Sequence, residues 1–182
     1  MKVLRNFLIL SIAILGFTFV EANAQNYTST RPATGIEQKV FKKIIGLPYY
    51  GVFDHISYEV NGSTVTLYGN VISLGTRKSA ERAVKNIEGV ETVVNNIKNL
   101  PPSPFDNEIR YRLLRTFANA SAVYGYLQEP NPSVRIIVDG GRVTLEGYVN
   151  NRGTANYMNS LANGIPGVFK VTNNLVVEKD SK

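Results

Sequence analysis

The pattern of apolar and polar positions divides the first part of the chain into five elements. Apolar residues recur three and four positions apart over residues 35–45, as on the buried face of a helix. Two segments of alternating apolar and polar residues follow at 56–60 and 64–71, and a second helical pattern covers 75–87. A last apolar segment at 90–100 predicts a third strand. The predicted order is therefore helix, strand, strand, helix, strand.

The same order returns in the second part of the chain. The turns between paired strands also match, since Asn61-Gly62 separates the first pair and Asp139-Gly140-Gly141 the second. Asn-Gly and Asp-Gly favour tight hairpins because both accept positive φ angles at low cost. The predicted elements of the second part are a helix at 106–122, strands at 134–138 and 142–149, a helix at 153–165 and a strand at 168–177.

A gapless internal repeat explains this agreement. When residues 61–100 are placed over residues 139–178, at a constant offset of 78, 14 of the 40 aligned positions are identical, which chance does not produce. The chain therefore holds two copies of one module. The identities fall where a turn or burial restricts the residue type, and they include Gly62/Gly140, Val65-Thr66-Leu67 with Val143-Thr144-Leu145, Gly69/Gly147, Val71/Val149, Gly75/Gly153, Ile87/Ile165, Gly89-Val90 with Gly167-Val168, and Asn95-Asn96 with Asn173-Asn174.

The repeat predicts an α+β fold of two tandem αββαβ modules, each a three-stranded sheet packed against two helices. Upstream of the strands Tyr50-Gly51 matches Tyr124-Gly125 at an offset of 74, so the second copy carries four extra residues. Prolines at 101, 102 and 104 predict a short, stiff linker. The predicted segments are a signal peptide at 1–24, a tail at 25–34, a first module at 35–100, a linker at 101–105 and a second module at 106–179.

The amino terminus has the features of a secretory signal peptide. Lys2 and Arg5 precede an apolar run at 7–20, and Ala22-Asn23-Ala24 has the small-x-small form that a signal peptidase cuts. The run is shorter than the roughly 20 residues of a spanning helix, which argues against the alternative of an uncleaved anchor. No cysteine follows it, so we expect no lipid anchor. We expect cleavage after Ala24 and export, in a bacterium to the periplasm.

Composition argues against most classes of catalytic site. The 182 residues include no cysteine and one histidine, which excludes disulfides, thiolate metal sites, iron–sulfur clusters and cysteine nucleophiles. The carboxylates Asp54, Glu59, Asp139 and Glu146 form no acid–base pair that the two copies share. The glycines form neither a Walker loop nor a dinucleotide fingerprint. We therefore expect no enzyme activity, no metal and no cofactor.

The chain has a modest basic excess. Its formal net charge of +6 becomes +5 once the predicted signal peptide is removed, divided as +3 for residues 25–100 and +2 for residues 101–182. The sequence pI of 9.5 invites a nucleic-acid partner. The predicted export and the lack of interleaved basic and aromatic residues argue against one. The placement of charge is therefore more informative than its total.

One helix of the first copy gathers its cations on one face. At 100° per residue, Lys78, Arg82 and Lys85 lie opposite the apolar stripe of residues 75–87, with Arg77 nearby. Such a strip suits the phosphates of a membrane surface or another polyanion. The alternative is a solvated helix face that Glu81 partly neutralises. The matching face of the second copy is uncharged, with Asn156, Tyr157, Asn159, Ser160 and Asn163, while Met158 falls on the core side.

Tyrosine-rich loops form a second candidate surface. They cover residues 47–53 and 123–127, between the first helix and the first strand of each copy, where tyrosines can contact a membrane interface or a protein groove. The alternative is that they seal the edges of small cores. His55 is a lone titratable group without a counterpart in the second copy, and we expect no functional role for it. The candidate aromatic contacts are Tyr49, Tyr50, Tyr124, Tyr126 and, on the helix, Tyr157.

These motifs resemble the BON domain, named for bacterial OsmY and nodulation proteins. The resemblance rests on Val-Thr-Leu-x-Gly-x-Val, a glycine-led helix, and Ile-x-Gly-Val-x-x-Val-x-Asn-x-Ile/Leu. It implies an αββαβ fold and similarity to exported, OsmY-like tandem proteins, with a role in envelope or osmotic stress, transport association and attachment to phospholipid. The motif segments are 65–71, 75 and 87–97 in the first copy, and 143–149, 153 and 165–175 in the second.

Two departures from the family limit what the resemblance implies. The lipid-anchoring cysteine of the tandem-BON lipoproteins of the outer membrane is absent. The second copy, where those lipoproteins contact phospholipid, has no basic face on its second helix and offers only Tyr157, its asparagine neighbours and Arg152 at the helix start. The first copy is therefore the better electrostatic candidate.

Two hypotheses of function follow. The first is a non-enzymatic exported protein that binds anionic phospholipid or membrane surfaces peripherally through Arg77, Lys78, Arg82 and Lys85. The second is a periplasmic protein-interaction or chaperone-like module that binds an envelope protein through its Tyr-rich loops and an exposed sheet face or edge. Neither hypothesis fixes the oligomeric state.

Overall fold

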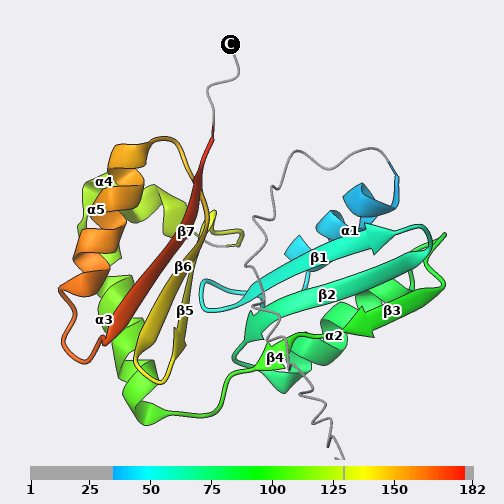
Figure 1. Cartoon of the computed structure of the whole chain (residues 1–182), viewed down its shortest axis with the longest axis horizontal. Helices are drawn as coiled ribbons and strands as arrows, with labels where there is room; N and C mark the ends of the chain where they lie inside the picture. The colour runs from blue at the N-terminus through cyan, green and yellow to red at the C-terminus, as the bar shows by residue number, and fades with distance from the viewer. Residues whose placement is uncertain (1–34, 129, 179–182) are drawn as a thin grey trace, which may run out of the picture.

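The structure is a computed structural model that describes residues 35–128 and 130–178. The predicted signal peptide and tail lie outside the described residues. Residues 35–100, called module one below, and residues 104–178, called module two, each fold as an α+β unit, and the two lie side by side with a short connection between them (Figure 1). This confirms the predicted fold class.

Module one follows the predicted order, with a break in its last strand. Strand β1 pairs antiparallel with β2, and β2 pairs in parallel with β3 and with a short β4. The two helices pack against one face of this sheet around a shared core that includes Val40, Leu67 and Val84. The elements are α1 (Ile36–Ile45), β1 (His55–Asn61), β2 (Thr64–Val71), α2 (Leu74–Lys85), β3 (Thr92–Asn95) and β4 (Lys98–Asn99).

The predicted continuous strand at 90–100 is wrong in one respect, because it is interrupted at Asn96 and Ile97, although the N–H of Asn96 still donates to the carbonyl oxygen of Leu67 at 2.8 Å. The N–H of Ile97 donates to the side-chain oxygen of Asn95, 3.2 Å away. The equivalent bond in module two, from Leu175 to Asn173, leaves the last strand unbroken, so this bond alone does not cause the bend. The two positions differ in burial, since Ile97 is buried and Leu175 is half-buried. The periodicity of apolar residues does not reveal such a bend.

Module two repeats the arrangement with a longer first helix. Strand β5 pairs antiparallel with β6, and β6 pairs in parallel with β7 along eight residues. Met158 is fully buried in the core of this module, as its position predicts. The elements are α3 (Pro104–Asn119), α4 (Ser121–Tyr124), the 3₁₀ turn η1 (Gly125–Leu127), β5 (Val134–Asp139), β6 (Arg142–Val149), α5 (Arg152–Asn163) and β7 (Lys170–Val177).

Helix α3 begins two residues before the predicted start and ends three residues before the predicted end. Ser103 caps it, because its hydroxyl accepts the N–H of Asp106 at 3.1 Å, and Pro104 occupies the first turn, where its missing N–H costs nothing. Two residues of the proline-rich segment therefore belong to the helix. At Ala120 the backbone is extended, which separates α3 from the single turn of α4.

A repeated glycine shows why the two copies share their strand geometry. Gly69 and Gly147 have φ angles of 119° and 116°, which side chains on L-residues rarely adopt. A Cβ atom there would lie 2.1 Å from the carbonyl oxygen of His55 in module one and 2.0 Å from that of Ser133 in module two. Both positions require glycine because the paired strand crosses too closely for any side chain.

Candidate functional site

The cationic strip of α2 lies on the surface of module one. Lys78, Arg82 and Lys85 are exposed and form no ion pair among the described residues. Arg77 differs, since it is half-buried and its guanidinium donates to the carbonyl oxygen of Asn95 at 3.4 Å. The strip therefore offers three free cations, while Arg77 is turned toward the edge of β3.

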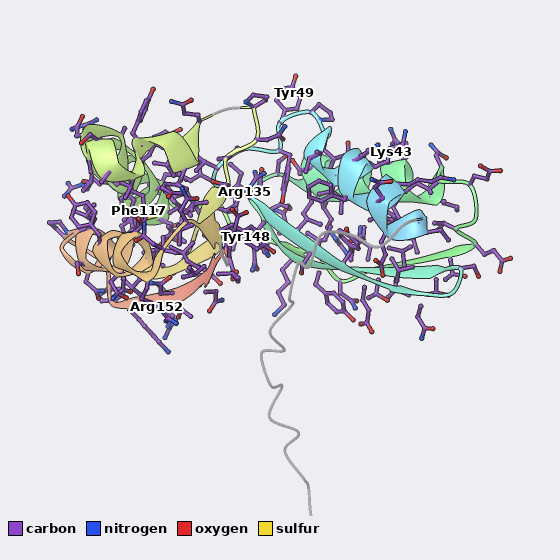
Figure 2. All side chains as sticks on the ribbon, turned by 90° about the horizontal axis from the view of Figure 1, so that it is seen from above. Lys43, Tyr49, Phe117, Arg135, Tyr148 and Arg152 are labelled. Atoms are coloured by element: carbon purple, nitrogen blue, oxygen red, sulfur yellow. The ribbon has the colours of Figure 1, made fainter. Side chains whose placement is uncertain are left out.

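Helix α1 adds exposed lysines that were not among the predicted site residues. Lys39, Lys42 and Lys43 are exposed on α1, whose Val40 and Ile44 share the core with α2. Lys43 lies on the helical side of module one (Figure 2). The signal in the sequence was three lysines within five residues, opposite an apolar stripe. We call Lys39, Lys42, Lys43, Lys78, Arg82 and Lys85 the basic layer.

Few acidic groups offset the basic layer. Lys39 forms an exposed ion pair with Glu88, with 3.4 Å between nitrogen and oxygen. Glu81 lies on α2 but accepts a hydrogen bond from the Asn95 amide at 2.9 Å, on the flank that faces β3. Phe41 is 43% exposed on α1 and adds an apolar group beside the lysines. The layer thus combines mainly unpaired cations with one aromatic ring.

The first Tyr-rich loop forms the contact between the modules. The carbonyl oxygen of Val52 accepts the N–H of Ile136 on β5 at 2.7 Å, and the Val52 side chain is buried in the core of module two. Phe53 packs edge-on against Tyr111 of α3, with 5.9 Å between ring centroids. This loop, residues 47–54, is called the docking loop below.

Arg135 is the polar anchor of this contact. It projects from β5, is 7% exposed, and donates to the carbonyl oxygen of Gly51 at 2.7 Å. Its guanidinium carbon lies 4.0 Å from the centroid of the Tyr50 ring, a cation–π arrangement. Figure 2 shows Arg135 at the boundary between the modules.

Asp54 ends the docking loop as a buried carboxylate. It accepts the N–H groups of Ile72 at 2.8 Å and Gly51 at 3.3 Å. Burial raises the pKa of Asp54, and the two hydrogen bonds act in the opposite direction. Next to it, burial and the charge of Arg135 lower the pKa of His55 to about 4. The lone histidine is thus a neutral group at the module boundary.

The tyrosines predicted as aromatic contacts differ widely in exposure. Tyr50 is 7% exposed and belongs to the module contact, whereas its neighbour Tyr49 is 93% exposed. Tyr124 and Tyr157 are about half exposed, at 50% and 44%. Tyr126 is half-buried, and its hydroxyl accepts the N–H of Asn150 at 3.4 Å. Tyr50 of the docking loop therefore lies in a core, as the structural alternative predicts, whereas Tyr49, Tyr124 and Tyr157 remain exposed.

The uncharged face of α5 is exposed as its spacing predicts. Arg152 begins the helix, and Asn151 caps it by accepting the N–H of Thr154 at 2.8 Å. Arg152 lies at the edge of module two, apart from Arg135 at the module boundary (Figure 2). The exposed residues on this helix include Asn156, Tyr157, Ser160 and Asn163.

Metal-ligand clusters, spanning helices and hollows were sought among the described residues. Residues 35–128 and 130–178 contain no cluster of three or more histidines and carboxylates suited to a metal ion. None of the helices in these ranges has the length and apolar character to cross a bilayer. A shallow hollow of about 340 Å³ lies between α3 and the loop after α5, where Arg112 pairs with Glu108 at 2.7 Å.

Comparisons with solved structures give weak matches. Two matched chains come from CdsD, a structural protein of the Type III secretion system of Chlamydia trachomatis. The first is its C-terminal domain, and the second comes from structural studies of the same protein. The first is 14% identical and covers 81% of this chain and all of that one, with a TM-score of 0.29. The second is also 14% identical and covers 78% and 91%, with a TM-score of 0.27. TM-scores this low support no conclusion about the fold or function of this chain.

Comparison with family models is decisive. No curated protein matches the chain in sequence. The BON domain model matches twice, over residues 33–101 and 106–179, which is most of the chain and coincides with the two modules. BON domains occur in membrane- and phospholipid-associated envelope proteins. With both modules matched and both folded as αββαβ units, the chain belongs to the BON domain family as a tandem BON protein.

Proposed function

We propose that this is a non-enzymatic, exported protein that binds anionic phospholipid surfaces peripherally and reversibly through the basic layer of module one. The observation that carries the proposal is the placement of six exposed cations on two adjacent helices, five of them without an ion-pair partner among the described residues. The occurrence of BON domains in phospholipid-associated envelope proteins supports the same choice.

Electrostatics sets the expected strength of this binding. Each lysine or arginine near an anionic membrane contributes about 1 kcal/mol. Each contact is weak, but several together are sufficient to hold the protein at the membrane surface. Salt weakens this binding because exposed charges are screened over about 8 Å at physiological ionic strength. Phe41 can enter the interfacial region beside the lysines, since aromatic rings are favoured at that depth.

Vesicle co-sedimentation tests the proposal. The mature chain should sediment with vesicles of phosphatidylglycerol and phosphatidylcholine and remain in solution with phosphatidylcholine alone. Lys78→Glu with Arg82→Glu should abolish most of the binding, and Lys42→Glu with Lys43→Glu should do the same.

The matched control is Arg142→Glu with Arg152→Glu, which makes the same change in net charge on module two. Both arginines are exposed, so the fold tolerates the change. Equal partitioning to both vesicles, or equal losses in the control and the α2 variant, would contradict the assignment to the basic layer.

The alternative of a protein-interaction module has less support from the geometry. Most of the docking loop is occupied within the chain, because Val52 is buried in the core of module two and Tyr50 in the core of module one, where Arg135 lies over its ring. Of the two adjacent tyrosines in that loop, only Tyr49 is available to a partner. Any capture of an envelope protein through this loop should therefore be lost in Tyr49→Ser.

Envelope or osmotic stress is the physiological setting that we propose for this binding. It rests on the family resemblance, and its test is the abundance of the protein after an osmotic upshift.

A further inference from the structure

Sheet edges carry unpaired N–H and C=O groups that another strand can bond, and proteins usually protect them. In module two, the edge of β5 is occupied by the docking loop, since Ile136 donates to the carbonyl oxygen of Val52. In module one, the N–H of Ile56 on β1 donates to the Tyr50 hydroxyl at 3.0 Å. Both edges that adjoin the module contact are therefore partly closed.

The edge of β3 is protected differently. Arg77 donates to the carbonyl oxygen of Asn95 at 3.4 Å, and the strand is broken directly after this residue. Lys98 then places an exposed charge on β4. A break and charged side chains are both devices that discourage pairing with another strand.

The corresponding edge in module two lacks the break and the arginine. Strand β7 runs unbroken for eight residues, and no described residue pairs with its outer side. The repeat places Ala155 at the position of Arg77, so no arginine reaches the carbonyl of Asn173. One outer N–H is occupied, because Leu175 donates to the side-chain oxygen of Asn173 at 3.2 Å. In Figure 1, β7 forms the outer strand of its sheet.

The hydrogen bonds between β6 and β7 show which backbone groups of β7 point outward. The N–H of Glu178 donates to the carbonyl oxygen of Val149 on β6 at 2.9 Å. Backbone groups of successive residues in a strand point to opposite sides, so every second residue points away from β6. The outward groups belong to Val171, Asn173, Leu175 and Val177.

The side chains of β7 are complementary to a second copy of themselves. Lys170 and Glu178 lie at opposite ends of the segment, both exposed and both on the face away from the helices. Antiparallel pairing of two copies centred on Asn174 places each Lys170 opposite the Glu178 of the other copy. In the same register the outward backbone groups meet as 171 with 177 and 173 with 175, as antiparallel hydrogen bonding requires. The Leu175 N–H then exchanges its bond to the Asn173 side chain for one to the backbone of the second copy.

We propose that β7 is a self-association edge, through which two copies of this chain pair antiparallel and join their second sheets into one. A second copy fits this edge because Lys170 and Glu178 carry opposite charges and because the strand is continuous, and a twofold axis through Asn174 closes the assembly as a dimer. The proposal does not depend on lipid binding, because the basic layer lies on module one. A dimer would carry two such layers and bind vesicles with avidity.

Charge exchange tests the register. Sedimentation velocity of residues 25–182 over a range of concentrations should show a monomer–dimer equilibrium. Lys170→Glu should weaken association by about tenfold or more, because like charges then face each other at both ends. The double variant Lys170→Glu with Glu178→Lys should restore it, and Lys98→Glu on β4 should leave it unchanged.

Disulfide trapping provides a second test. The chain has no cysteine, so Asn174→Cys introduces a single thiol at the proposed axis. Directly opposed residues at a non-hydrogen-bonded position have Cα atoms about 4.5 Å apart, within the range of a disulfide. The variant should form a covalent dimer on oxidation, whereas Asn156→Cys on exposed α5 should not.

A monomer at all concentrations, or a dimer that Lys170→Glu leaves unchanged, overturns the proposal. Either result leaves vesicle binding by the basic layer to be judged on its own test.

Discussion

The guanidinium of Arg135 stacks on the Tyr50 ring at 4.0 Å and also donates to the carbonyl oxygen of Gly51. One side chain of module two thus holds two groups of the docking loop. The backbone bond from Ile136 to Val52 lies beside it. Because this contact is largely buried, we expect the modules to unfold as one cooperative unit.

Replacing Arg135 should uncouple the modules. Arg135→Ala removes a buried charge-assisted hydrogen bond and a cation–π contact, so unfolding free energy should fall by about 2 kcal/mol. Urea unfolding should then show two steps or a broadened transition. Arg142→Ala, on the neighbouring strand but exposed, should change stability by less than about 0.5 kcal/mol. Equal effects of the two variants would count against the anchoring role.

Shortening Val52 should destabilise the module that does not contain it. Val52 is 6% exposed in the core of module two, so Val52→Ala should cost about 2 kcal/mol and lower the hydrogen-exchange protection of Ile136. Val94→Ala, at 41% exposure on β3, should cost far less. Unchanged exchange at Ile136 would show that module two does not rely on the docking loop.

His55 should make stability depend on pH. Its pKa of about 4 in the folded chain lies below the ordinary 6.5, so the unfolded chain binds the proton first and acidification favours unfolding. The contribution of His55 is complete above pH 6.5 and declines as pH falls toward about 4. The difference in unfolding free energy between the native chain and His55→Gln should change by about 1 kcal/mol between about pH 7.5 and 5.5. Parallel pH curves for the two proteins would refute this.

A methyl group added at either repeated glycine should strongly lower the free energy of unfolding. Gly69→Ala places a Cβ atom 2.1 Å from the carbonyl oxygen of His55 at a φ of 119°, so we expect a loss of at least about 3 kcal/mol in thermal or urea unfolding. Gly147→Ala should behave alike in module two. Gly125→Ala meets no atom within 4 Å at a φ of −58° and should be neutral or slightly stabilising. A tolerated Gly69→Ala would show that the strands can separate there.

The sequence predicted most of the fold because burial and turn geometry repeat with the modules. Gly69 and Gly147 recur because the strand crossing excludes a side chain in both copies. The break after Asn95 was not predictable from the repeat, since Asn95-Asn96 recurs as Asn173-Asn174 with the same local hydrogen bond in a strand that stays unbroken. The α2 strip was found from helical spacing, while the lysines of α1 gained meaning only when packing placed the two helices together.

The module contact was missed, although β5 contained a signal for it. Ile136, Ile137 and Val138 form an unbroken apolar run, which is typical of a strand covered on both faces. In module one the matching strand alternates and has Ser57 where β5 has Arg135. An arginine in a strand normally indicates a solvent-exposed position, and only the docking loop explains why Arg135 is buried.

The docking loop also makes the contact between the two modules asymmetric. The contact is heterologous, because a loop of module one meets a strand of module two and the reverse contact is absent among the described residues. In module two the stretch at the same place in the repeat is folded into α4 and η1. The two copies of one module therefore have different parts in the contact, since the first supplies the loop and the second supplies the strand that receives it.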